Sequence, residues 1–261
     1  MAVYTVNPGD TLAPALSRRD RQREATSLEI RDTARRQLAA TGAAGLSLRA
    51  VAREMGLTAP ALYRYFDDRD ALLTALIVDA YTSLVEALEA ARDAQPADRG
   101  AERLAAACLA YRQWGLDAPH DFALVFGSPV PGYEAPEDGP TREAGARFGQ
   151  LCLELFAAAG GGQADDPPPS ALRGQALDRA LALAAEACGV ALEPGPMQLF
   201  LSSWGRLHGL ISLEVFGHLH WVGMPDPAAL FRAEVADLLR RIGVELTREQ
   251  LVRVERRSAR A

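Results

Sequence analysis

The sequence predicts an all-α protein with a small N-terminal helical domain and a larger helical body. Apolar residues recur at helical spacing along nearly the whole chain of 261 residues, and the sequence contains no alternating β-branched run long enough to indicate a strand. Apolar residues make up 49% and charged residues 24%, which excludes a disordered or fibrous chain. No apolar run approaches the length of a membrane span, and the N-terminus lacks the pattern of a signal peptide. We therefore expect a cytoplasmic protein that does not bind membranes.

Charge differs between the two ends of the chain. Residues 1–70 contain 11 Arg and 9 acidic residues, whereas residues 71–261 contain 17 Arg and 25 acidic residues, and the formal net charge is −6. Four of the N-terminal arginines precede the first predicted helix, namely Arg18, Arg19, Arg21 and Arg23. A basic head on an acidic body suits a small DNA-contacting domain.

Helix start and stop signals give the order of elements. In the head, the predicted helices are Ser27–Ala40, Leu48–Met55 and Ala59–Phe66, with glycines at 42 and 56 as stops. In the body, Asp68 caps a long helix to Ala94, and further helices are predicted over 101–116, 120–126, 141–158, 171–188, 197–220 and 227–242. Segments 127–140 and 160–169 are rich in Pro and Gly and are predicted to be loops.

These signals divide the chain into four parts. We predict a basic, flexible arm over residues 1–24 and a helix-turn-helix DNA-binding domain over 25–71. A helical ligand-binding and dimerisation domain follows over 72–243, and a charged tail that frays over 244–261.

The segment from Ser47 to Phe66 has helix-turn-helix spacing, with two short helices joined by a tight turn at Gly56. Its outward face is small and apolar at the start of the second helix and then aromatic and basic, which suits a major groove. Ser47 and Thr58 begin helices, where hydroxyl and backbone N–H groups bind phosphates. The predicted DNA contacts are Ser47, Arg49, Thr58, Ala59, Pro60, Ala61, Tyr63, Arg64 and Arg69. Taken singly, Ser47, Thr58 and Asp68 could instead be ordinary helix caps and Tyr63 a surface aromatic.

The segment Leu46–Leu73 resembles the tetracycline-repressor (TetR/AcrR) family of bacterial transcriptional regulators. It matches the family signature VA-x-x-x-G-(V/L)-(S/T)-x-x-x-(L/I)-Y-x-(H/Y)-F at almost every position. Arg69 stands where the family typically has a Lys that contacts a phosphate, and the arm before the first helix is longer. Trp204–Glu214 resembles the Trp-His-Gly (WHG) type of C-terminal ligand-binding domain. Together with His120–Gly127, this suggests that residues 25–243 follow one family pattern.

The resemblance implies a ligand-responsive repressor that binds a palindromic operator in double-stranded DNA as a homodimer and is released by a small molecule. It implies no cofactor besides this effector, whose identity the sequence does not give. Candidates for the effector pocket are Tyr111, Trp114, Phe122, Phe126, Phe148, Trp204 and His208; the alternative is that most of them are core residues. The resemblance also implies that the last two long helices pack against their partners. The candidate dimer contacts are Leu199, Leu207, Leu210, Ile211, Leu230 and Leu238.

Three alternatives compete with this interpretation. The same fold could act as an activator or as a non-specific DNA-binding module, and an enzyme is the alternative from another class. The sequence contains no phosphate-binding loop, nucleophile elbow or HExxH motif. Glu214 and His218 are one helical turn apart, but His220 would point elsewhere on a helix. We therefore expect neither an enzyme nor a metal site. The cysteines Cys108, Cys152 and Cys188 are predicted to be small core residues.

Overall fold

The computed structural model describes residues 17–136, 138–163 and 170–259, and within these ranges it contains eleven α-helices, three short 3₁₀ helices and no strand. The prediction of an all-α fold is confirmed. Residues 1–16 of the predicted arm, residues 137 and 164–169 of the predicted loops and residues 260–261 of the tail lie outside the described residues. The chain divides into two compact units, Met1–Leu73 and Thr74–Ala261, where the sequence predicted a boundary after residue 71.

The first unit is a small helical domain. It contains α1 (Arg18–Thr41), η1 (Ala43–Gly45), α2 (Leu48–Glu54), α3 (Ala59–Leu62) and the first turn of α4 (Arg69–Asp93). Its core is formed by Ile30 and Ala34 of α1, Val51 of α2 and Leu62 of α3, which are all fully buried. Three helices therefore enclose one core, because each presents an apolar stripe to the other two.

Helix α1 begins at Arg18, nine residues before the predicted start at Ser27. Ser17 is its N-cap, and the Ser17 hydroxyl accepts a hydrogen bond of 3.2 Å from the backbone N–H of Asp20. The prediction of a flexible arm is thus wrong for residues 18–24. The helix ends as predicted at Gly42, which has φ 70° and donates its N–H to the carbonyl of Leu38.

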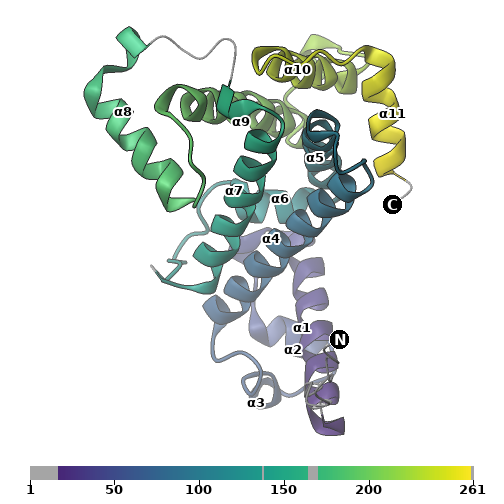
Figure 1. The fold of residues 1–261 in the computed structure, drawn as a ribbon. Coiled ribbons are helices and arrows are strands. Elements are labelled where there is room, and N and C mark those ends of the chain that lie inside the picture. Colours follow the sequence, from purple (N-terminus) through teal and green to yellow (C-terminus); the bar gives the residue numbers. More distant parts are fainter. Residues whose placement is uncertain (1–16, 137, 164–169, 260–261) are drawn as a thin grey trace, which may run out of the picture. The chain divides into compact units, whose positions relative to one another are not determined.

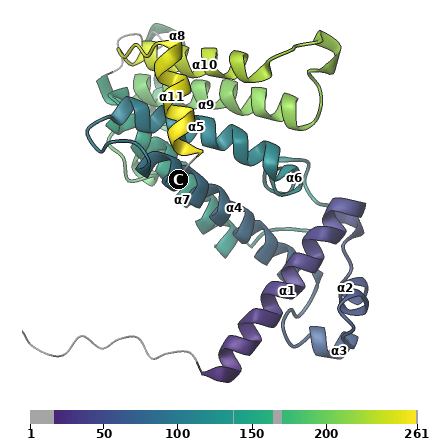
Figure 2. The same ribbon diagram turned by 90° about the vertical axis from the view of Figure 1, so that its right-hand side faces the viewer.

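The second unit is a bundle of helices in which α5 is central. Besides the rest of α4, it contains α5 (Gly100–Asp117), α6 (Pro119–Phe126), α7 (Pro140–Ala158), η2 (Gly161–Gln163), α8 (Ser170–Ala187), α9 (Pro194–Val215), η3 (His220–Val222), α10 (Pro227–Arg241) and α11 (Arg248–Ser258). Helix α5 contacts α6, α7, α9, α10 and α11, and α9 lies side by side with α8 and α10 (Figures 1 and 2). Ala105 and Ala106 on α5 are fully buried, and their small side chains let neighbouring helices approach closely.

Helix α9 ends at Val215, whereas the sequence predicted a helix to His220. Gly217 has φ 73°, a left-handed conformation that favours glycine, and the next N–H, of His218, bonds to the carbonyl of Leu213 at 2.7 Å. The chain then turns through η3 before α10. Helix α8 is also interrupted, because Gly174 has φ 70° within it.

The tail does not fray over residues 248–258, which form the amphipathic helix α11. Thr247 and Gln250 form a reciprocal capping box at its start. Leu251 and Val254 are buried, and the Gln95 amide donates a hydrogen bond to the carbonyl of Val254 at 3.3 Å. The sequence analysis missed this helix because most residues of the segment are charged, and the apolar residues at helical spacing are few.

Helix α4 is long and apolar enough to meet the length and hydropathy criteria for a membrane span. Leu72, Leu76, Leu84 and Leu88 on this helix are nevertheless buried in the protein itself. A core helix of this kind meets the same criteria, so the finding is weak evidence for a membrane segment.

Candidate nucleic-acid interface and effector cavity

Helices α2 and α3 form a helix-turn-helix. Gly56 ends α2 with φ 66°, and the N–H of Leu57 bonds back to the carbonyl of Ala52 at 2.8 Å. Leu62 of α3 and Ala52 of α2 are both buried, so the two helices share the core of the first unit. The other face of α3 carries the exposed Pro60 and the half-buried Ala59 and Ala61.

Helix α3 is shorter than predicted, because it spans Ala59–Leu62 instead of continuing to Phe66. The carbonyl of Leu62 accepts from the N–H of Tyr65 at 2.9 Å and from the N–H of Phe66 at 3.2 Å, so the chain tightens into a turn after one helical turn. Phe66 is nevertheless buried.

Most of the predicted DNA contacts are exposed in the structure. Ser47, Arg49, Thr58, Pro60, Tyr63 and Arg64 are exposed, while Ala59, Ala61 and Arg69 are half-buried. Tyr63 is an aromatic side chain left 42% exposed. The hydroxyls of Ser47 and Thr58 make no capping hydrogen bond to the helices that they precede, although both residues are N-caps. Both hydroxyls therefore lie at helix starts without bonding to the helix that follows. The first N–H groups of α2 likewise receive no side-chain cap.

Arg69 differs from the other predicted contacts. Its guanidinium donates a hydrogen bond of 2.9 Å to the carbonyl of Ala43 and lies 3.6 Å from the Asp70 carboxylate. It thus ties the start of α4 to η1. A phosphate contact from Arg69 stays a prediction, and it would have to share the guanidinium with these internal partners.

Arg23 of the first unit is not among the predicted DNA contacts, but it has a structural role there. Its guanidinium donates to the carbonyl of Arg64 at 3.3 Å and lies 6.0 Å from the centre of the Tyr65 ring. The early part of α1 is thereby tied to the end of the helix-turn-helix. Ser17 followed three residues later by Asp20 is a helix-start signal that could have revealed this.

In the second unit, the predicted pocket residues form one aromatic cluster around His208. The Nδ1 of His208 lies 2.8 Å from the Tyr111 hydroxyl, and its ring stacks on Trp204 with centroids 5.0 Å apart. The rings of Phe122 and Phe126 lie 5.6 Å and 5.0 Å from the same imidazole. The two remaining members, Trp114 and Phe148, contact Phe122 and Tyr111 respectively.

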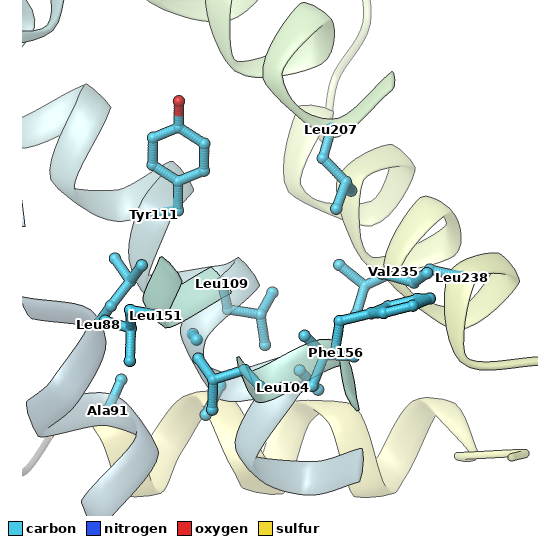
Figure 3. Packing of buried hydrophobic residues seen from close by; sticks show 14 of the residues in the cluster. Leu88, Ala91, Leu104, Leu109, Tyr111, Leu151, Phe156, Leu207, Val235 and Leu238 are labelled. Carbon is cyan, nitrogen blue, oxygen red and sulfur yellow. The ribbon is translucent and has the colours of Figure 1, made fainter. Parts of the chain in front are cut away.

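A cavity of about 50 Å³ lies beside this cluster, between α4, α5, α7, α9 and α10. Of the seven predicted pocket residues, Tyr111 and Trp204 line it. The other lining residues are Leu88, Leu104, Ala107, Cys108, Cys152, Leu155, Phe156, Phe200, Ser203, Leu207 and Leu238. Figure 3 shows several of these converging from different helices, with Leu88, Leu104, Phe156, Leu207 and Leu238 labelled. Only packing reveals these residues, because apolar side chains of a cavity wall and of a solid core have the same sequence pattern.

Burial keeps the ionisable groups of this region neutral. It raises the pKa of the Cys108 thiol to about 12, and it raises the pKa values of Cys152 and Tyr111 as well. Burial lowers the pKa of His208 below its ordinary value of 6.5. Cys108 and Cys152 therefore act as small apolar residues, as the sequence predicted, and they also form part of the cavity wall. Cys188 is half-buried and packs against another apolar cluster, with Leu153, Leu181 and Met197.

Four of the six predicted dimer contacts lie in the chain's own core. Leu199 and Ile211 are fully buried, and Leu207 and Leu238 are nearly so. The prediction is wrong for these four side chains, because a residue enclosed by its own chain has no surface to offer a partner. Leu210 and Leu230 are half-buried, so their part in a dimer stays a prediction. The apolar side chains that are exposed at this end of the chain are Leu201, Leu213, Phe216, Trp221 and Val222.

Glu214 pairs with an arginine and not with histidines. The Arg112 guanidinium donates two hydrogen bonds, of 2.8 Å and 2.5 Å, to the two carboxylate oxygens of Glu214. The two side chains are 11% and 16% exposed, so the pair joins α5 to α9 in a largely buried setting. Among the residues that the structure describes, no three His, Cys, Asp or Glu side chains are grouped so as to hold a metal ion.

Comparison with protein families gives two matches along the chain. The model described as "Bacterial regulatory proteins, tetR family" matches residues 30–76, and the model described as "Tetracyclin repressor-like, C-terminal domain" matches residues 104–238. The first match covers the helix-turn-helix, and the second covers every residue of the cavity wall except Leu88. Neither description specifies the WHG type, which stays a prediction.

Relatives and solved structures agree with these matches. The chain is 38% identical to the HTH-type transcriptional regulator Rv1816 of Mycobacterium tuberculosis (strain ATCC 25618 / H37Rv), over 83% of this chain and 92% of the relative. The crystal structure of the regulatory protein SCO4313 superposes with a TM-score of 0.71 at 38% identity, covering 86% of this chain and all of that one. PfmR, a TetR family transcriptional regulator from Thermus thermophilus, has a TM-score of 0.51 at 19% identity, over 84% of this chain and 99% of that one, and so shares the fold.

Proposed function

The chain belongs to the TetR family of DNA-binding transcriptional regulators, and we propose that it is a ligand-responsive repressor that acts as a homodimer on a palindromic operator. In this proposal a small molecule is the effector that releases the DNA, no further cofactor takes part, and the protein works in the cytoplasm without enzymatic activity. The relatives named above are regulators, which supports the same class for this chain.

The observation that carries the proposal is that one helix takes part in both candidate sites. Helix α4 starts with Arg69, which anchors it to the first unit, and its Leu88 lines the cavity of the second unit. A ligand in the cavity would contact a helix that also belongs to the DNA-binding unit. The ligand would release DNA only if it binds more tightly to a certain conformation of the second unit. In that conformation, the spacing between the two DNA-binding units of the dimer would differ from the half-site spacing of about 34–36 Å.

The exposed apolar side chains near the end of α9 support the proposed dimer. Trp221 is 87% exposed, and Leu213 and Phe216 are each more than two-fifths exposed. Side chains of this kind gathered within a short stretch favour an interface with a second copy. We therefore propose that this stretch, and not the buried side chains predicted from the sequence, forms the dimer contacts.

Transcription in vitro tests the direction of regulation. A promoter carrying the protein's own operator is transcribed with and without the protein, while light scattering gives the mass of the species in solution. The proposal expects a dimer that lowers the yield of transcript. A dimer that raises the yield would make the protein an activator, and an equal effect on a promoter without the operator would indicate non-specific binding.

A further inference from the structure

Ser203 has a hydroxyl that is buried without a hydrogen-bond partner among the described residues. The side chain is 4% exposed and lines the cavity from α9. A serine hydroxyl within a helix can point to solvent or bond to a carbonyl of the preceding turn. The neighbouring Ser202 does the latter, since its hydroxyl donates to the carbonyl of Leu199 at 3.1 Å. Buried polar groups are rarely left without a hydrogen bond, so we expect the hydroxyl of Ser203 to bond to a molecule bound in the cavity.

Water is a poor partner for this hydroxyl. A cavity of about 50 Å³ has room for water, but a buried water needs two to four polar partners. The other hydroxyl in the wall, that of Tyr111, already bonds to His208. The remaining lining side chains are aliphatic groups, thiols and aromatic rings, among which the indole of Trp204 carries one N–H donor, so the wall offers a water few of the polar partners that it needs.

We propose that the cavity binds a neutral, mostly apolar molecule carrying a single hydroxyl or carbonyl group, which forms a hydrogen bond with the hydroxyl of Ser203. This inference rests on the proposed function, because it names the chemical class of the effector. It makes Ser203 the residue that orients the ligand within a wall that is otherwise mostly apolar.

The wall argues against charged ligands. None of the thirteen lining residues is Asp, Glu, Lys, Arg or His, so an ionised ligand would lose its hydration without gaining an opposite charge. The high pKa of Cys108 keeps that thiol neutral as well. The ligand therefore has to enter in its uncharged form.

The size of the cavity sets a second condition. About 50 Å³ is smaller than the roughly 150 Å³ that admits benzene to an engineered apolar cavity. Phe200 and Trp204 are half-buried lining residues on α9, at the edge of the core. A ring-sized ligand would be admitted by an outward movement of these two side chains, so binding would act on the same helix that carries Ser203.

Titration with three probes of similar size tests the proposal. Phenol, toluene and benzoate are each added to the full-length protein, and the ¹³C-methyl NMR signals of the leucines that line the cavity report binding. Phenol and toluene should shift these signals, whereas benzoate should bind at least about 100-fold more weakly than phenol because its charge would be unpaired. Failure of phenol to shift the lining leucines, or binding of benzoate as tight as that of phenol, would overturn the proposal.

Two serine variants isolate the hydrogen bond. Ser203→Ala should weaken phenol binding about 3- to 10-fold, the usual net effect of one hydrogen bond, and leave toluene binding unchanged. Ser202→Ala, at the exposed neighbouring position, should change neither affinity. Equal phenol affinity in wild type and Ser203→Ala would contradict the proposal.

Operator affinity is measured separately with phenol present, so that the two proposals can fail independently. Binding of phenol that depends on Ser203 but leaves operator affinity unchanged would support the assignment of the cavity and count against ligand release. Loss of operator affinity that is equal in wild type and Ser203→Ala at the same phenol concentration, chosen below saturation of either protein, would count against the assignment of the cavity.

Discussion

The two units of the protein present their candidate functional residues in opposite ways. In the first unit, Tyr63 and Arg64 are exposed on a helix-turn-helix whose apolar residues are buried behind them. In the second unit, Tyr111 and Phe122 are buried in an aromatic cluster around His208. A site that contacts double-stranded DNA must lie on the surface, whereas a site for a small apolar molecule must be enclosed. Substitutions should therefore affect DNA binding and stability in different ways in the two units.

The largest effect is expected from Arg112→Met in the second unit. It leaves the Glu214 carboxylate largely buried without its partner, which should lower the free energy of unfolding by about 3 kcal/mol. Chemical denaturation measures this change. The double variant Arg112→Met/Glu214→Leu should regain most of the loss, because it removes both charges. A loss below about 1 kcal/mol for the single variant would show that solvent screens the pair.

Ala61→Asp in the first unit should have the next largest effect, and it should act on DNA binding without destabilising the protein. The half-buried Ala61 lies on α3, where a new carboxylate would face DNA phosphates and bases without a partner. We expect operator affinity to fall at least about 100-fold with an unchanged melting temperature. Ala39→Asp adds the same charge to an exposed position of α1 and is the matched control. Equal losses in both variants would mean that α3 does not enter the groove.

Tyr63→Ala should weaken binding to all DNA sequences about 10-fold, because we expect this exposed tyrosine at the end of α3 to contact the DNA backbone and not the bases. Gel-shift titrations with operator and random DNA measure both affinities. Tyr63→Phe separates the hydroxyl from the ring. A loss of affinity for the operator but not for random DNA would instead mean that Tyr63 contacts the bases.

The smallest effect concerns His208 and pH. Because burial lowers its pKa below the ordinary 6.5, the unfolded chain takes up a proton before the folded chain does as pH falls. Protonation thus favours unfolding, and stability should decline as pH falls through 6.5 towards the lower folded pKa. His208→Gln should show a smaller decline in melting temperature over this range. Identical declines in both proteins would mean that His208 does not contribute.

Local signals predicted the first unit better than the second. Gly42 and Gly56 end helices as expected, because positive φ angles are local requirements that glycine meets. The start of α1 was missed because the Ser17 cap precedes the first buried residue, Ile30, by more than three turns. The apolar periodicity of α1 therefore begins well after the helix itself.

The buried parts of the second unit depended on packing that periodicity does not specify. The same spacing that marks Leu199 and Ile211 as one apolar face does not tell whether this face meets its own chain or a partner. Likewise, nothing local separates Ser203, which lines the cavity, from its exposed neighbour Ser202. The residues of the aromatic cluster were named as pocket candidates because of the family resemblance, which implies an effector pocket in this part of the chain.

Selection of bound fragments from a random DNA pool by the purified protein tests the central claim most directly, followed by affinity measurements on the selected fragments at several salt concentrations. We expect a palindrome that is bound by a dimer at least about 10³-fold more tightly than random DNA. If refolded protein, freed of any co-purified ligand, also enriched no sequence and bound all DNA equally, the claim that the helix-turn-helix reads an operator would be contradicted.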